Sequence, residues 1–458
     1  MVLHTGHRRQ PRPTRQSLLC VVALLPFSAL APLAAQTRPL VDHHQHFFSQ
    51  AFVALISPKP APAPTLPAEV AEVLRSFERA AGDSAVRADL YTEDASLADS
   101  LGATWIRGRQ AIVAWWSGAR QAPLRVQPAS FSASGDVAHL VADLVRVADE
   151  RDPPRAVAHV LFTLRRGADA RWRIAGEAVT GIGPRVEAID AKHLIGLMDA
   201  AGTQRAMVLA LGYSWGSPNR TVESEYEKVR AENDWTSAQV AQHPTRLVGF
   251  CGVNPLRDYA LAEIDRCARD PNLRNGLKLH VGNSVVALGD TAHVAQLRRV
   301  FAAANRHRMP IVIHLRSSYS RRLPYGRDEA RVFLERVVPA APDVPVQIAH
   351  LASGGGYDDP PADSVIAYLA ERIAAKDART RNLWFDVSGV ATLGMSTVEA
   401  ELVAKRLRQL GLRRILWGSD GATGGNLPPR QAWAAFRQLP LTDAEFRSIA
   451  TNVAPWMR

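Results

Sequence analysis

From residue 205 onward the chain repeats one pattern, a short β-branched apolar run followed by a turn and a helical stretch. Seven such runs are 205–211, 246–254, 276–281, 309–315, 344–351, 383–388 and 414–420. An eighth run, 39–47, lies nearer the N-terminus, and helical patterns such as 294–304 and 400–410 separate the others. Strands that are apolar along their whole length and alternate with helices indicate a parallel sheet covered on both faces.

Eight such units over roughly 270 residues predict an α/β fold, a TIM (β/α)8 barrel. An open, doubly wound sheet is the alternative. It is less favoured, because no glycine-rich dinucleotide-binding turn follows the first strand.

The first and second barrel strands are separated by about 150 residues, far more than one crossover needs. A Pro/Ala-rich stretch at 58–69 has the composition of a linker. We expect an α+β domain over 64–184, with its helices first and antiparallel strands after them. The predicted elements are a helix with Val70, Val73, Leu74 and Phe77 on one face, a helix at 110–117, and strands at 137–148, 156–166 and 171–180. The barrel then comprises residues 36–57, with strand one and the following loop, and 186–458.

Polar side chains gather at the predicted carboxyl ends of the barrel strands, where catalytic residues of this fold collect. His44 and His46 alternate with Gln45 and therefore point to the same face of strand one, an arrangement typical of half a zinc site. His314, His350 and Asp420 end the fifth, sixth and eighth strands. One histidine at a strand end is usually structural, but four histidines and one aspartate at the same rim are not explained by packing alone.

With these motifs the barrel resembles the amidohydrolase superfamily, in particular the amidohydrolase-related group that includes non-oxidative decarboxylases. The resemblance spans 38–54 and about 186–458. It implies one divalent metal, usually Zn²⁺ with Mn²⁺ as the alternative, held by His44, His46, His314 and Asp420. It also implies that His350 acts as an acid/base. Zinc lowers the pKa of bound water to about 7, and we expect Asp420 to accept that water's proton and His350 to protonate the leaving group.

Two cationic side chains near the rim have open roles. Lys278 lies on strand four, where two-metal members of the superfamily carry a bridging carbamylated lysine; it can equally pair with Asp420 or bind a substrate carboxylate. Arg316 follows His314 by two residues and suits a carboxylate through its planar fork, or is a solvated loop arginine. His43 and His280 also lie near the rim, and we expect them to pack or to cap.

The segment 64–184 is similar to the SnoaL-like or NTF2-like cone, through 91–95 (YTEDA), 106–116 (IRGRQAIVAWW) and 171–179 (RWRIAGEAV). The resemblance implies a homodimerisation module or a shield over the barrel mouth, with an independent catalytic pocket as the less favoured alternative. Asp94, His139 and His159 are the polar residues that could line such a pocket, although ordinary strand or loop positions are the simpler interpretation.

Residues 1–35 have the pattern of a signal peptide, with four arginines, no acidic residue and an apolar run that ends in small residues. Prolines within the run favour cleavage over a retained membrane anchor, which predicts a periplasmic or secreted protein without a stable membrane span. Cleavage lowers the formal net charge from +11 to +7. That excess is spread along the chain and does not indicate nucleic-acid binding. Cys251 and Cys267 either form a disulfide or remain buried thiols.

The residues point first to hydrolysis of an amide, ester or lactone bond in a small molecule by a metal-activated water. The main alternative is non-oxidative decarboxylation of an aromatic or unsaturated acid. A third possibility is a non-catalytic binding or assembly protein in which the inserted domain carries the function. The complete set of five rim residues argues against that third interpretation, because an inert barrel need not keep them.

Overall fold

The computed structural model describes residues 37–57, 62–80, 83–99, 104–118, 124–146, 155–181, 186–421 and 426–457. The expected signal peptide lies outside these residues. Within the described ranges, no helix combines the length and the apolar character needed to cross a bilayer.

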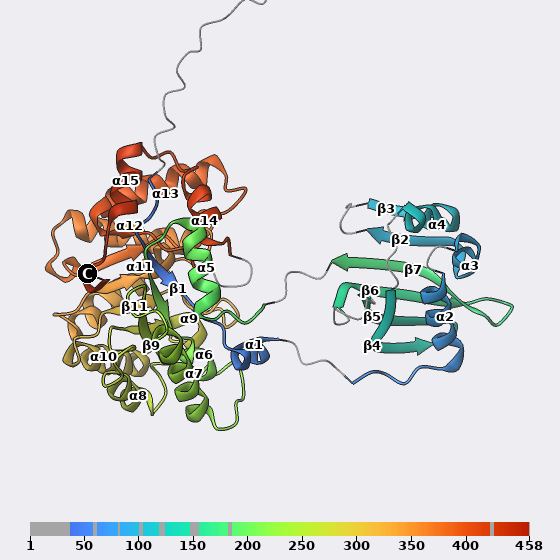
Figure 1. Cartoon of the computed structure of the whole chain (residues 1–458), viewed down its shortest axis with the longest axis horizontal. Coiled ribbons are helices and arrows are strands. Elements are labelled where there is room, and N and C mark those ends of the chain that lie inside the picture. The colour runs from blue at the N-terminus through green and yellow to red at the C-terminus, as the bar shows by residue number, and fades with distance from the viewer. Residues whose placement is uncertain are drawn as a thin grey trace, which may run out of the picture. The chain divides into compact units, whose positions relative to one another are not determined.

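Eight parallel strands form the barrel, in the spatial order β1-β8-β9-β10-β11-β12-β13-β14 (Figure 1). Backbone hydrogen bonds close the circle, since His43 N donates to Trp417 O at 2.9 Å and Asp420 N donates to His44 O at 2.8 Å. The strands are β1 (Val41–Gln45), β8 (Arg205–Leu209), β9 (Leu247–Gly252), β10 (Leu277–His280), β11 (Ile311–His314), β12 (Val346–Ile348), β13 (Leu383–Asp386) and β14 (Ile415–Leu416). All eight predicted barrel strands are present, each within its predicted run.

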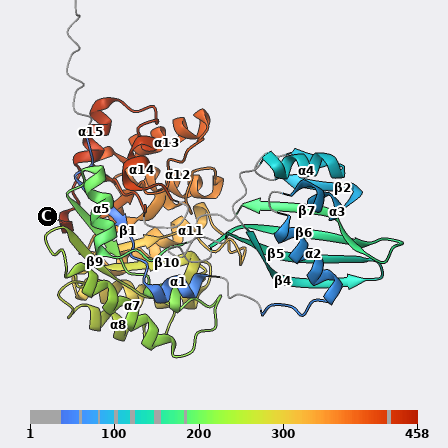
Figure 2. The same cartoon turned by 45° about the vertical axis from the view of Figure 1, so that its right-hand side comes forward.

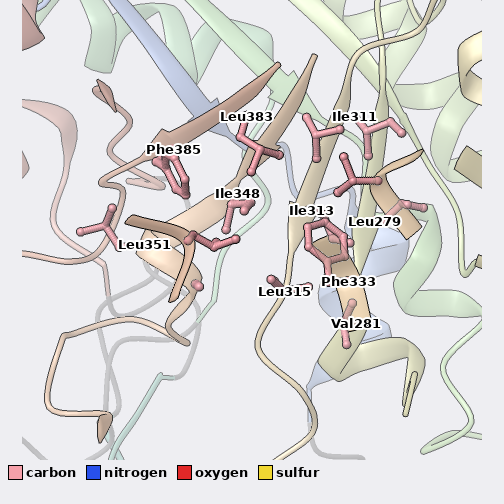
Figure 3. Close-up of a cluster of buried hydrophobic side chains, with 14 of the residues drawn as sticks. Leu279, Val281, Ile311, Ile313, Leu315, Phe333, Ile348, Leu351, Leu383 and Phe385 are labelled. Carbon is pink, nitrogen blue, oxygen red and sulfur yellow. The ribbon is translucent and has the colours of Figure 1, made fainter. Parts of the chain in front are cut away.

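Helices follow the barrel strands and bury the outward-facing apolar side chains. Leu279, Ile313, Ile348 and Phe385 pack in one continuous core with helix residues such as Phe333 (Figure 3). The helices are α1 (Gln50–Ile56), α5 (Ala191–Ala201), α6 (Gly212–Trp215), α7 (Glu225–Val240), α8 (Ala260–Cys267), α9 (Val281–Ser284), α10 (Thr291–Arg306), α11 (Arg327–Val332), α12 (Pro360–Ala374), α13 (Thr397–Leu410), α14 (Pro429–Phe436) and α15 (Asp443–Thr451). This rigid wall fixes the carboxyl ends of the strands.

The inserted segment leaves and re-enters the barrel at one place. Phe48 and Ile189 form an antiparallel bridge, with backbone N–O distances of 3.0 and 2.9 Å in the two directions. Because the two ends of the insertion are joined there, the long segment between them interrupts one crossover without breaking the barrel.

The insertion itself is an α+β unit with three helices on a six-stranded sheet of order β3-β2-β7-β6-β5-β4 (Figure 2). Its elements are α2 (Ala68–Arg79), α3 (Ser84–Asp89), β2 (Tyr91–Asp99), β3 (Thr104–Arg107), α4 (Arg109–Gly118), β4 (Leu124–Ser134), β5 (Val137–Arg146), β6 (Arg155–Arg166) and β7 (Trp172–Gly181). The two helices and three strands predicted there are confirmed.

The three predicted strands are antiparallel, as expected, because β5 pairs with β6 and β6 with β7 in that sense. The expectation that the helices come before all the strands is wrong. Strands β2 and β3 precede α4, and β2 pairs with β7 in parallel. Pairing between residues about 80 positions apart, as between β2 and β7, leaves no trace in the local hydrophobic pattern. The sequence also did not predict β3 and β4, although these pair with their neighbours in the chain, β2 and β5.

Polar residues inside the insertion are not those named from the sequence. Asp94 and His159 are exposed and pair with Arg165 and Asp143, so they are ordinary strand residues. His139 is also exposed. Among the described residues of the insertion, Arg87 and Glu177 are the buried charged side chains. Glu177 accepts a hydrogen bond of 2.6 Å from Tyr91 Oη and one of 3.4 Å from Trp116 Nε1.

Cys251 in β9 and Cys267 in α8 form a disulfide, and both are fully buried. This selects one of the two alternatives that the sequence left open. The bond ties the third strand of the barrel to the helix that follows it.

Candidate metal centre

A cavity of about 330 Å³ opens at the carboxyl ends of the barrel strands. It brings together five of the predicted rim residues, namely His46, Lys278, His314, His350 and Asp420. His44 lies directly beneath, with its ring centroid 4.5 Å from that of His350 and 5.2 Å from that of His46. The remaining lining residues are Phe48, Phe52, Leu211, Tyr213, Ser214, His280, Asn283, Gly354, Gly355, Gly389 and Asn426.

His44 is held in one orientation by a buried carboxylate. Its Nδ1 donates to Asp386 Oδ2 at 3.0 Å, which leaves the Nε2 lone pair directed at the cavity. Burial lowers the pKa of His44 to about 3, with the positive charge of Lys278 acting in the same direction. The ring is therefore neutral near pH 7, the state that a metal ligand requires.

His46 is oriented by a hydrogen bond in the same way, whereas His314 is held by ring stacking. Nδ1 of His46 donates to the carbonyl of Leu209 at 2.6 Å, and its Nε2 is 3.8 Å from Asp420 Oδ1. The His314 ring stacks on that of His280 with centroids 3.8 Å apart. Burial holds the pKa of both His46 and His314 well below the usual value, so both rings keep a free lone pair.

His350 stands on a strained turn. His350, Leu351 and Ala352 all have left-handed backbone angles, with φ of 55°, 47° and 60°. Such angles cost about 1–3 kcal/mol per residue, so the surrounding structure must hold them. Asp386 Oδ1 accepts from the His350 backbone N at 3.0 Å, and Tyr325 Oη donates to Ala352 O at 2.6 Å. The ring Nδ1 is 2.8 Å from Ser388 O, which leaves Nε2 for the cavity.

Asp420 also has a left-handed backbone, with φ of 51°, just after β14. Gly418 allows this segment to approach β1, because a Cβ at that position would lie 2.8 Å from His44 Cβ. Asp42 fixes the same segment through its two oxygens, accepting from Ser419 N at 3.0 Å and Ser419 Oγ at 2.6 Å. Burial raises the pKa of Asp420, whereas neighbouring Lys278 lowers it.

Lys278 is buried, and its Nζ donates to His44 Nε2 at 3.2 Å. Because His44 donates its Nδ1–H to Asp386, the amine of Lys278 contacts the Nε2 lone pair that a metal would need. Burial lowers the pKa of the Lys278 amine, while the charges of Asp420 and Asp386 raise it.

Arg316 does not line this cavity and is not a solvated loop residue. Its Nε donates to Asp359 Oδ2 at 2.5 Å and its Nη2 to Asp359 Oδ1 at 3.3 Å. The guanidinium carbon lies 3.9 and 4.6 Å from the ring centroids of Tyr319 and Tyr325. The guanidinium donors that a substrate carboxylate would need are therefore already paired with Asp359. The sequence could not show this, because Asp359 lies 43 positions further along the chain.

His43 and His280 have structural contacts, as expected. His43 Nδ1 donates to Trp417 O at 2.9 Å, and its Nε2 accepts from Ala454 N at 3.2 Å. His280 Nδ1 accepts from Asn283 N at 3.1 Å, which caps α9. The ring of His280 additionally forms part of the cavity wall.

Asp386 is the main residue that sequence reasoning missed. It receives hydrogen bonds from His44 and from the His350 backbone, and Ser388 Oγ bridges Asp386 Oδ1 to His350 Nδ1 at 2.6 and 2.9 Å. The sequence did contain a signal, since Asp386 lies near the carboxyl end of the predicted strand 383–388. The position of His314 at the end of its own strand is what identified that residue. Burial acts to raise the pKa of Asp386, but His44 and His350 lower it overall.

The donor set fits a divalent ion. Donor atoms of His44, His350 and Asp420 all lie within 4.8 Å of one another, and all three residues are buried. Neutral imidazoles together with a carboxylate are the ligands that zinc and manganese take. This grouping includes His350, whereas the sequence assigned His46 and His314 as ligands; both rings border the same cavity.

A sequence model of the amidohydrolase family matches residues 189–452, more than half of the chain. The matched range contains His314, His350, Asp386 and Asp420, while β1 with His44 and His46 precedes it. Comparison with curated proteins gives no match.

Many solved structures are similar to parts of the chain, among them the following three. The 5-carboxyvanillate decarboxylase of Sphingomonas paucimobilis has 19% identity and a TM-score of 0.40, covering 56% of this chain and 79% of that one. The 5-carboxyvanillate decarboxylase of Novosphingobium aromaticivorans, with bound manganese, has 15% identity and a TM-score of 0.39, covering 59% and 82%. A ketosteroid isomerase-like protein of Erwinia carotovora atroseptica has 19% identity and a TM-score of 0.21, covering 26% and 93%.

Proposed function

The chain belongs to the amidohydrolase family, and we propose that it is a metal-dependent hydrolase that cleaves an amide, ester or lactone bond of a small molecule. The observation that carries this proposal is the cavity in which neutral, buried imidazoles face the Asp420 carboxylate at the barrel mouth. These groups can bind a divalent cation, bind water and move a proton within one enclosed space.

His44, His46, His314 and Asp420 are the residues that we propose to hold one divalent ion, Zn²⁺ or Mn²⁺. When bound, such an ion supplies Lewis-acid polarisation and lowers the pKa of water toward neutrality. The hydrogen bonds from His44 to Asp386 and from His46 to Leu209 O set the ring orientations before any ion arrives.

The proton transfers fall to Asp420 and His350. Asp420 Oδ1 lies 3.8 Å from His46 Nε2, and we propose that this carboxylate accepts the proton of the attacking water. His350 presents Nε2 to the cavity because its Nδ1 is engaged by Ser388. His350 is therefore placed to receive that proton from Asp420 at Nε2 and to pass it to the leaving nitrogen or oxygen.

The charge of the cavity favours a neutral substrate. Among the described lining residues, Lys278 is the one lysine or arginine, and Arg316 is committed to Asp359 outside the lining. Beside the proposed divalent ion, an aromatic diacid would find one cationic side chain, Lys278, for its second carboxylate, whereas a neutral ester, lactone or amide needs none. Lys278 itself is the observation in favour of decarboxylation, because it could orient a substrate carboxylate.

Two measurements test the proposal. A panel of esters, lactones and amides is incubated with the metal-loaded protein in ¹⁸O-labelled water, alongside aromatic carboxylic acids monitored for carbon dioxide. Incorporation of ¹⁸O into a product acid supports hydrolysis, whereas carbon dioxide release without incorporation supports decarboxylation. Less than about half an equivalent of bound divalent metal, with no gain on adding zinc or manganese, would instead favour a non-catalytic barrel.

For the inserted domain, 64–184, we propose homodimerisation through the open face of its sheet. One cross-strand row on that face joins Val141, Leu161, Ala178, Ala98 and Trp105. Val141, Leu161 and Trp105 are 39%, 41% and 69% exposed, although solvent-facing strand positions normally carry polar groups. A second copy of the same apolar row would cover them.

The oligomer test compares Leu161→Asp with Glu69→Lys, an exposed change on α2. Light scattering coupled to gel filtration should give a dimer for the unmodified chain and for Glu69→Lys, and a monomer for Leu161→Asp. A monomeric unmodified chain would refute the proposal.

Export to the periplasm or outside the cell is a further proposal, based on residues 1–35 and supported by the Cys251–Cys267 disulfide, a bond typical of oxidising compartments. Mass spectrometry of the protein from a secreting host should find Gln36 as the mature N-terminus. A retained leader in the cytoplasmic fraction would contradict it.

A further inference from the structure

A second cavity, of about 270 Å³, adjoins the metal centre between the loops that follow β13 and β14. We call it the side pocket. Its walls include Val387, Trp417, Leu427, Ala432 and Phe436. Trp417 and Phe436 are each 2% exposed, so these walls are fixed by the barrel core.

The side pocket borders the mouth of the barrel. Gly389 and Asn426 line both cavities. The Asn426 amide stands at this shared border, because its Nδ2 donates to Asp420 Oδ2 at 2.9 Å and to Asp420 O at 3.1 Å. A molecule whose reacting bond lies beside Asp420 thus has the side pocket next to it.

The chemistry of the side pocket is apolar. Its described lining contains no charged side chain. Of its polar groups, Ser419 Oγ is engaged by Asp42 and Gln45, and Asn426 by Asp420. At the rim stands Leu393, whose side chain is 76% exposed and adds to the apolar surface. A charged substituent placed here would lose its hydration without compensation.

We propose that the substrate carries an uncharged, apolar substituent next to the scissile bond and that the side pocket binds it. This inference rests on the hydrolase proposed above and assigns its substrate class: esters, lactones or amides with a medium-length alkyl chain or a single aromatic ring. The volume equals roughly nine water molecules at about 30 Å³ each, which suits such a group.

The kinetic test compares p-nitrophenyl acetate with p-nitrophenyl hexanoate, and acetanilide with hexananilide. Each buried methylene is expected to raise kcat/KM about fourfold, which gives roughly 250-fold over four methylenes. Equal kcat/KM values for the short and long members of both pairs would overturn the proposal.

A substitution that fills the side pocket supplies the structural control. Ala432→Leu on α14 places a larger side chain in the wall and should reduce the long-to-short ratio at least tenfold. Ala434→Leu, two residues along the same helix and exposed, should leave the ratio unchanged. Ala391→Leu repeats the test from another part of the wall, in case Ala432→Leu fails to fold. An unaltered ratio in both wall variants would refute the assignment.

Binding separates this inference from the hydrolase proposal. If no member of the panel is hydrolysed, the proposed function fails, but calorimetry with hexanamide and acetamide still tests the side pocket. Tighter binding of hexanamide to the full-length protein, with the preference lost in Ala432→Leu and kept in Ala434→Leu, supports the pocket without any turnover. Equal binding of the two amides rejects it.

Discussion

The Nδ1 atom of His44 lies 3.0 Å from Oδ2 of Asp386, and both side chains are completely buried. The other oxygen of Asp386 accepts from the backbone N of His350 at 3.0 Å. One carboxylate therefore orients both a proposed metal ligand and the proposed acid/base. It does so from β13, a strand to which the sequence assigned no role in the site.

Replacing this positioning carboxylate should weaken metal binding more than it weakens the fold. Asp386→Ala removes the acceptor that holds the His44 ring in place and keeps its proton on Nδ1. The affinity for zinc should therefore fall about 10- to 100-fold. A titration against a competing chelator measures it. Asp199→Asn, which removes only an exposed partner of Arg246, is the control and should bind metal normally. Unchanged affinity in Asp386→Ala would show that other contacts orient His44.

Asp420→Asn should abolish turnover while the protein stays folded. The amide cannot accept a proton from water, and general-base catalysis contributes about 100- to 10,000-fold. Rates on the best substrate of the panel, with circular dichroism as the check on folding, test this. Appreciable retained activity would mean that another residue activates the water.

Lys278→Met should tighten metal binding. The lysine ammonium donates to the His44 Nε2 lone pair at 3.2 Å and places a positive charge beside the site. Methionine has a similar length and no charge, so a competitor for that lone pair is removed. Calorimetric zinc titration of the two proteins decides the direction. Weaker binding in the variant would indicate that Lys278 itself helps to hold metal, as a bridging carbamate would.

The stability of the inserted domain should fall as the pH rises from about 4.5 to about 7. Burial raises the pKa of Glu177 from 4.5 to about 7, while Tyr91, Trp116 and Arg87 around it lower the pKa. In the unfolded chain the Glu177 carboxyl ionises at a lower pH than in the folded chain. The free energy of unfolding therefore falls across this window, by up to about 3 kcal/mol, and stays constant above it.

Hydrogen exchange of peptides from β7, compared between variant and unmodified protein at each pH, measures this effect. Glu177→Gln should remove the pH dependence and be the more protected of the two proteins at pH 7. Glu69→Gln, an exposed change on α2, should behave as the unmodified protein does. A pH-independent difference between Glu177→Gln and the unmodified chain would contradict the prediction.

Reduction of the Cys251–Cys267 bond should lower the free energy of unfolding by about 3 kcal/mol, because the bond closes a short loop of sequence separation 16. Denaturant titrations with and without reductant measure the change. Two thiols that react in denaturant without reductant would show that the bond is absent from the isolated protein.

The sequence by itself determined the barrel and most of its rim. Hydrophobic periodicity is a local property, so all eight barrel strands could be predicted from their apolar runs. Side chains alternate along a strand, and function collects at the carboxyl ends of barrel strands. These two rules placed His44, His46, His314, His350 and Asp420 at the same end of the barrel.

Only the tertiary structure decided which groups pair with one another. His44 and Asp386 are 342 positions apart, and Arg316 meets Asp359 from a different loop. The parallel pairing of β2 with β7 and the choice of a disulfide between Cys251 and Cys267 are of the same kind. Such contacts depend on the distance between side chains in the folded chain, which no local pattern of residues encodes.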